Sequence, residues 1–199
     1  MSRTRARFAA TGTAVVLAVT GLSGAAVADT APASTPSTGS AVVNSSTTFL
    51  KDSALNGIVV IPLPTASPSY DSTTGISTTF PVTGGSANLP SYYGDIDLGG
   101  GLLFINLFTG KSATFKQLHF NVGTWQITGV AVGTTTPVAL LDPAGDSEVT
   151  RTGTLQTLSA SDLQLDAAGA QYLDTKLNTS FFTGGQSVGS FALKFTPGS

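Results

Sequence analysis

Few side chains in this sequence could carry chemistry, because the residue types that most active sites use are scarce. The 199 residues include no Cys, one His and one Glu. Without Cys, a disulfide framework, a thiolate zinc site and a cysteine nucleophile are all excluded. The remaining candidates are His119, the neighbouring carboxylates Asp95 and Asp97, and the four tyrosines.

Three of these residues could bind a cofactor. A phenolate oxygen or an imidazole nitrogen can ligate haem iron, Tyr92 and Tyr93 lie together just after Pro90, and His119 is the only imidazole. We therefore take Tyr92, Tyr93 and His119 as the candidate cofactor-binding residues. The alternatives are a turn or rim position for the tyrosines and, for His119, a solvated position opposite the apolar face of its strand.

The carboxylates and one glycine-flanked serine give weaker signals. Asp95 and Asp97 would share one face of a strand, where paired carboxylates can do acid/base work, but aspartates at the edge of a turn are the preferred interpretation. The acidic loop expected at 142–148 could hold Ca²⁺, although it lacks the EF-hand spacing. Ser187 lies in a G-x-S-x-G motif, yet a nucleophile elbow needs a strand before the serine and a helix after it. Here a helix precedes and a strand follows, so we expect no catalytic residue and no metal site.

The elements that must position these residues are mostly strands. Seven prolines between positions 62 and 143 interrupt the chain too often for long helices. Apolar runs, alternating or continuous, predict strands at 57–61, 102–105, 114–122, 125–132, 137–141 and 188–195. One helix is expected over 167–177, with Asp166 as N-cap and Asn178 at its exit. The expected fold class is mainly β: an antiparallel sandwich or barrel-like domain with one short helix in the C-terminal region.

The N-terminus is typical of a secretory signal peptide over residues 1–28. Arg3, Arg5 and Arg7 precede an apolar stretch that closes on A-V-A at 26–28, a cleavage pattern for signal peptidase. An uncleaved membrane anchor is the alternative, but several Thr and Gly residues dilute the stretch. Residues 29–40 contain nothing apolar larger than Ala and are expected to be a disordered Ser/Thr/Pro linker. The β domain would then occupy 41–199.

Charge limits the partners of the expected mature chain. Six basic and eleven acidic residues remain after position 28, and the basic ones are scattered. Such a chain has no footprint for nucleic acid and no basic run for anionic lipid. With the signal removed, no membrane span is expected. The predicted location is secreted or extracellular, in solution or associated with the cell envelope.

Three segments in a fixed order resemble the HtaA-like family of secreted domains from Gram-positive actinobacteria. They are F-P-V-T-G-G at 80–85 with G-D-I-D-L-G-G-G-L at 94–102, V-A-L-L-D at 138–142, and the L-Q-L to G stretch at 163–185 that contains the expected helix. The resemblance covers about residues 41–195. It implies an all-β fold with a small helix and no catalysis. Because family members include haem-binding domains of the cell surface, it also implies haem as a cofactor.

The sequence departs from the family pattern at two places. Asp97 stands where the family shows a His before the glycine pair, and residues 54–57 (A-L-N-G) stand near the aromatic-rich start that carries a tyrosine ligand in haem-binding members. Both departures remove residues that would hold iron. Tyr92, Tyr93 or His119 would have to replace them.

The expected function is that of a secreted, non-enzymatic binding domain, with haem or an envelope component as its partner. The alternative is a structural or adhesive envelope protein that binds proteins or glycans through exposed loops. A large apolar pocket with Tyr92 or His119 at its mouth would favour the first function. A filled core with an exposed patch that bears tyrosines would favour the second.

Overall fold

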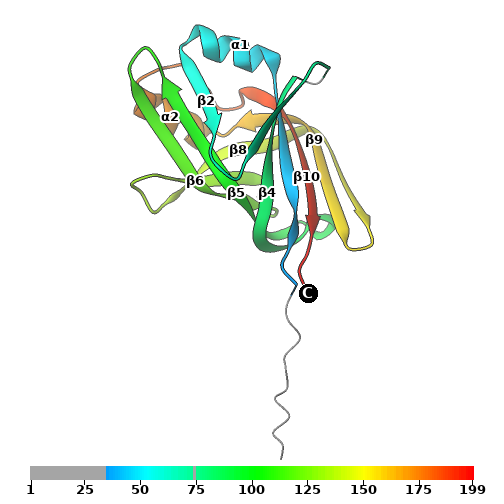
Figure 1. Ribbon diagram of the computed structural model, residues 1–199. Coiled ribbons are helices and arrows are strands. Elements are labelled where there is room, and N and C mark those ends of the chain that lie inside the picture. Colours follow the sequence, from blue (N-terminus) through cyan, green and yellow to red (C-terminus); the bar gives the residue numbers. More distant parts are fainter. Residues whose placement is uncertain (1–34, 74) are drawn as a thin grey trace, which may run out of the picture. The chain divides into compact units, whose positions relative to one another are not determined.

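Strands dominate the structure, as the short apolar runs and frequent prolines predict. A computed structural model describes residues 35–73 and 75–199 (Figure 1). The expected signal peptide, 1–28, and most of the expected linker, 29–40, lie outside these residues. The strands are β1 (Thr38–Ser45), β2 (Ile58–Pro62), β3 (Ser67–Asp71), β4 (Gly75–Asn88), β5 (Tyr93–Asn106), β6 (Lys111–Asn121), β7 (Gln126–Ala131), β8 (Pro137–Thr152), β9 (Leu155–Leu165) and β10 (Ser187–Thr196). The helices are α1 (Thr47–Leu55), α2 (Ala167–Leu177) and the 3₁₀ turn η1 (Leu89–Ser91).

Eight of these strands close into an antiparallel barrel. Hydrogen bonds link all ten strands in the order β2-β5-β6-β7-β8-β9-β10-β1-β4-β3, and a further pairing between β5 and β4 closes the ring of eight from β5 to β4. Register shifts interrupt β5 between Leu98 and Gly101 and β6 between Lys116 and His119. Such bulges bend strands and increase their twist, which allows a sheet to close. The predicted mainly β, antiparallel, barrel-like fold is confirmed.

The closing pair, β4 and β5, is joined along only part of its length. The register pairs Val82 with Leu98 and continues to the η1 turn, where Asn88 meets Tyr93. Farther along, β5 pairs with β2 and β4 pairs with β3. The two added strands therefore replace the β4–β5 contact at one end of the barrel. Helix α1 lies at this end (Figure 1), which we call the α1 end.

Helix α1 was not predicted. The Ser46 side chain accepts a hydrogen bond from the Phe49 backbone N–H at its start, as an N-cap residue does. The helix has only nine residues and begins with two threonines, so it offers no sustained helical period. Its stability comes from packing at the α1 end, which a local sequence pattern does not predict.

Helix α2 matches its prediction from end to end. Asp166 accepts a hydrogen bond from the Ala168 N–H at 2.6 Å, and Asn178 ends the helix in the left-handed region at φ 53°. The buried side of α2 contains Gly169, Ala170, Leu173 and Leu177. This side packs on the barrel next to β8 and β6.

Two expectations about loops are wrong. Residues 142–148 are not a loop: they lie within the long strand β8, which carries a register shift between Ala144 and Ser147. The expected linker overlaps β1, because Thr38–Ser40 pair with Lys194–Thr196 of β10. Strand pairing uses backbone groups, so it does not need large apolar side chains. The folded domain thus begins before the expected boundary at 41.

Candidate functional site

The barrel contains an apolar cavity of about 280 Å³, which reaches the surface beside the exposed residues Pro68 and Ile76. Alternate residues of a strand point to the same side, and this alternation brings Val60 of β2 and Thr78 and Phe80 of β4 into the cavity wall. Helix α1 adds Phe49 and Leu50. The rest of the wall is Val43, Ser45, Pro62, Pro68, Ile76, Leu98, Leu102, Phe104, Leu118, Ile127, Leu141, Leu165, Phe182, Val188 and Phe191.

The chemistry of this wall is almost entirely hydrocarbon. Among the described residues that line it, only Ser45 and Thr78 carry a polar side-chain atom. A concave apolar site with one or two polar groups is suited to an apolar small molecule. Axial ligation of haem iron needs imidazole, thiolate, thioether or phenolate, and the wall supplies none of them. The cavity therefore fits an apolar ligand but does not fit iron coordination by its own side chains.

Tyr92 and Tyr93 lie on the outside of the molecule rather than in the cavity wall. They are 55% and 60% exposed, at the junction of η1 and β5. Tyr92 ends η1 with φ 55°, and its ring stacks on that of Trp125 with centroids 5.8 Å apart. The two tyrosines thus form part of an exposed aromatic surface at the turn that leads into β5.

His119 is held by two carboxylates. Its Nδ1 lies 2.8 Å from Asp97 Oδ1 and its Nε2 lies 3.0 Å from Asp95 Oδ1. Asn121 also donates to Asp95 Oδ1, at 2.7 Å. The intervening Ile96 is fully buried, so the aspartates share the opposite, outer face of β5, as the sequence predicted.

The two carboxylates favour the charged imidazole. Partial burial lowers the pKa of His119, but the hydrogen bonds and charges of Asp97 and Asp95 outweigh it and raise the pKa above 6.5. Both ring nitrogens can donate only in the imidazolium form. His119 is therefore occupied as the centre of an ion-pair triad on the outer face, and the structure does not bring it together with the cavity.

Ser187 has the context of a turn rather than of a nucleophile. It opens β10 after helix α2, and its hydroxyl donates to Asp162 Oδ1 at 2.5 Å. The order helix, turn, strand is the reverse of a nucleophile elbow. Within residues 35–73 and 75–199, no group of three or more His, Cys, Asp or Glu side chains is arranged to hold a metal ion.

The sequence did not predict that Asp142 and Asp166 form an acidic pair. Asp142 Oδ1 is buried and has no hydrogen-bond partner among the described residues. Burial first, and then the charge and hydrogen bond of Asp166, raise the pKa of Asp142 to about 6. The two aspartates are 24 positions apart and meet because β8 pairs with β9, where Leu141 lies opposite Leu165, the residue before Asp166. No local pattern could therefore have indicated the pair.

Comparison with known proteins supports the fold of this chain. No protein-family model matches the chain, and no curated protein matches it. Among solved structures, the crystal structure of the C-terminal domain of HtaA from Corynebacterium glutamicum superposes with a TM-score of 0.54 at 15% identity, over 82% of this chain and 98% of that one. The domain-swapped dimer of the H434A variant of the same domain gives a TM-score of 0.47 at 15% identity, over 75% and 88%. The HtaA-like fold that the three motifs predicted is thereby confirmed as a fold.

Proposed function

We propose that this domain binds an apolar small molecule inside the barrel and is not an enzyme. The observation that carries this proposal is the hydrocarbon wall of the 280 Å³ cavity. Protein cores are normally packed without voids of this size, and an unfilled cavity costs stability. The likeness of the fold to the C-terminal domain of HtaA supports binding rather than catalysis.

The ligand we propose is bound without coordination to iron. The resemblance to the HtaA-like family implies haem, but the wall offers no axial ligand. Tyr92, Tyr93 and His119, the residues that would have to replace the family's ligands, all lie outside it. Recognition would then rest on shape and apolar contact, with Ser45 and Thr78 as the polar groups that fix orientation.

A neutral fluorescent probe tests the cavity. N-phenyl-1-naphthylamine brightens in apolar surroundings, and we expect saturable binding to the purified protein. Val60 lines the cavity, whereas its neighbour Ile61 is exposed on the other side of β2. Val60→Phe should fill the space and weaken binding by about tenfold or more, the equivalent of roughly 1.4 kcal/mol. Ile61→Phe is the matched control and should bind as the wild type does. Equal binding by the two variants would refute the proposed site.

A titration with oxidised haem tests the absence of iron coordination. We expect any haem uptake to be insensitive to Tyr92→Ala, Tyr93→Ala and His119→Ala, because these side chains lie outside the cavity wall. A saturating one-to-one spectral shift that one of the three substitutions abolishes would contradict this and would make haem the ligand.

The proposed location is outside the cytoplasm. Its support is the signal-peptide pattern at 1–28 and the A-V-A sequence at 26–28. Neither helix in the described part of the chain has the length and apolar character that crossing a bilayer requires. Mass spectrometry of the exported protein should find a chain that begins at Asp29. An exported chain that still contains residues 1–28 would overturn the predicted cleavage.

A second candidate function is adhesion to an envelope component, either protein or glycan. Tyr92 and Tyr93 are more than half exposed and Tyr92 stacks on Trp125, and an exposed aromatic surface suits a partner with apolar faces. Retention on envelope fractions should fall in Tyr92→Ala and Tyr93→Ala. Tyr70→Ala is the control, because Tyr70 is even more exposed, at 74%, but lies on β3. Equal loss in all three variants would count against this surface.

A further inference from the structure

Three large apolar side chains protrude at the α1 end. Leu55, Leu107 and Phe108 are 69%, 64% and 75% exposed; we call them the apolar tip. Leu55 is the last residue of α1, and the other two lie in the turn between β5 and β6. This turn contacts the segment that follows α1, because the Leu107 N–H donates to the Gly57 carbonyl at 2.8 Å. A Cβ on Gly57 would come within 2.9 Å of the Phe108 ring.

Hydrogen bonds of Asn106 and Thr109 hold the turn that carries Leu107 and Phe108. The buried Asn106 side chain accepts from the Phe108 N–H at 2.9 Å and donates to the Leu177 carbonyl at 3.1 Å. The Thr109 hydroxyl donates to the same carbonyl at 2.8 Å. Two hydrogen bonds to the Leu177 carbonyl thus tie the turn to the end of α2. The two apolar side chains are held outward by an ordered turn.

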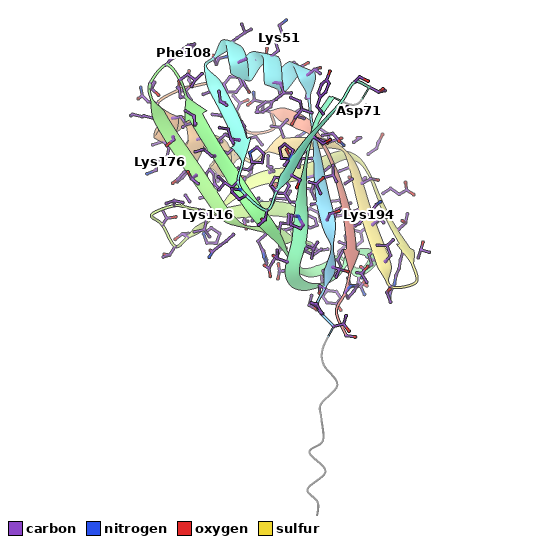
Figure 2. The ribbon with its side chains drawn as sticks, in the orientation of Figure 1. Lys51, Asp71, Phe108, Lys116, Lys176 and Lys194 are labelled. Carbon is purple, nitrogen blue, oxygen red and sulfur yellow. The ribbon has the colours of Figure 1, made fainter. Side chains whose placement is uncertain are left out.

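Two lysines lie next to the apolar tip, one on α1 and one at the start of β6. Lys51 lies four residues before Leu55 and therefore on the same side of α1, and Figure 2 shows it at the same end of the barrel as Phe108. Lys111 opens β6 three residues after Phe108. Lys176, at the end of α2, does not belong to this group, because its Nζ lies over the Tyr172 ring, 5.6 Å from the ring centroid. The sequence contains no basic run, but the fold brings Lys51 of α1 and Lys111, which pairs with Asn106 at the start of the turn, to the end of the barrel that carries the apolar tip.

We propose that the apolar tip docks the domain onto a lipid surface with anionic headgroups. Leu55, Leu107 and Phe108 would enter the boundary between headgroups and acyl chains, while the lysines contact phosphate. Protruding apolar side chains beside basic ones are how proteins lie on a bilayer without crossing it. A stable protein interface needs about 800 Å² from each partner, which three side chains on a convex end do not supply.

Docking at the apolar tip would also bring one wall of the cavity near the acyl chains of the bilayer. Phe49 and Leu50, which line the cavity, lie on the same short helix as Leu55. Docking through the end of α1 would hold this wall of the cavity close to the bilayer. The docking itself does not depend on what the cavity binds, so failure of the probe experiment above would leave it standing.

Sedimentation with vesicles tests the docking. The purified protein should pellet with vesicles of phosphatidylglycerol and phosphatidylcholine at low salt, and binding should weaken with added salt and on pure phosphatidylcholine. Phe108→Ser should reduce the partition coefficient by about tenfold, since most of a Phe side chain would leave the boundary region. Val132→Ser is the matched control: Val132 is an exposed apolar residue in the β7–β8 turn, and its loss should leave binding unchanged.

Three results would overturn the proposal. These are no co-sedimentation with the anionic vesicles, equal binding by Phe108→Ser and Val132→Ser, or a concentration-dependent dimer that Phe108→Ser abolishes. The dimer would make the apolar tip an interface between copies of the chain. A double variant, Lys51→Gln with Lys111→Gln, separates the charge contribution: it should bind anionic vesicles more weakly than the wild type, and adding Phe108→Ser should weaken binding by a further factor of about ten.

Discussion

Replacing Asp142 with Asn should stabilise the protein at neutral pH. The Asp142 carboxylate has a buried Oδ1 without a hydrogen-bond partner among the described residues, and it lies beside the Asp166 carboxylate. Burial, and secondly Asp166, raise the pKa of Asp142 from 3.8 to about 6. At neutral pH the side chain is therefore ionised in a place that disfavours its charge. An Asn amide would carry no charge and could donate to Asp166.

The size of the gain follows from the difference in pKa between the folded and unfolded states. A change of about two pKa units corresponds to roughly 3 kcal/mol. Because much of the side chain still faces solvent, screening reduces this to about 1–1.5 kcal/mol. The folded state binds the proton more tightly than the unfolded state. Wild-type stability is therefore favoured below pH 3.8, falls as the pH rises from 3.8 through about 6, and carries the full penalty above that range.

Urea unfolding at pH 3.5 and pH 7.5 measures this penalty. We expect Asp142→Asn to raise the free energy of unfolding by about 1–1.5 kcal/mol at pH 7.5 and to leave it nearly unchanged at pH 3.5, where Asp142 is neutral. Asp146→Asn is the control, because Asp146 is an exposed carboxylate on the same strand. If Asp142→Asn were neutral or destabilising at pH 7.5, or equally stabilising at both pH values, the explanation that burial and Asp166 destabilise the ionised Asp142 would be refuted.

Three further outcomes follow from the same structure. NMR titration of His119 should give a midpoint above 6.5 that falls in Asp97→Asn, since the carboxylates outweigh burial; the stability gained from this triad is full below 6.5 and is lost as the pH rises through the folded pKa. A midpoint below 6.5 in the wild type would contradict the triad. Gly101→Ala should lower the free energy of unfolding by about 1–3 kcal/mol, because its Cβ would meet the Phe115 carbonyl oxygen; an unchanged urea midpoint would show that the strands can separate freely. Leu173→Ala should cost about 2–5 kcal/mol, since Leu173 is fully buried in α2; a loss below 1 kcal/mol would mean that α2 contributes little to the core.

Local signals predicted the elements that local chemistry stabilises. Helix α2 was predicted to the residue, because Asp166 and Asn178 provide a cap and an exit and the buried positions recur at helical spacing. The face of His119 was also predicted from alternation with Leu118 and Phe120, and both neighbours are buried. In each case the relevant information lies within about a dozen residues of sequence.

The cavity could not be predicted, because distant pairings create it. Its wall combines α1 with strands from both ends of the chain, and its position depends on β4 and β5 parting beyond Val82 and Leu98. The choice of β2 as the partner of β5 in that region is a long-range event without a local sequence signal. Reasoning from residue types drew attention to Tyr92, Tyr93 and His119, whereas the cavity wall is made of residues that look like ordinary core.

The placement of Asp97 clarifies what the departure from the family pattern means for this chain. Asp97 points to the outer face and binds His119, so a change of residue there does not alter the cavity wall. The wall is shaped instead by α1, which presents Phe49 and Leu50 rather than a side chain able to ligate iron. For the apolar ligand we propose, selectivity would come from the volume of the cavity and from the hydroxyls of Ser45 and Thr78. A compact ligand with a hydrocarbon body and one hydrogen-bonding group fits such a wall better than a ligand held by a metal.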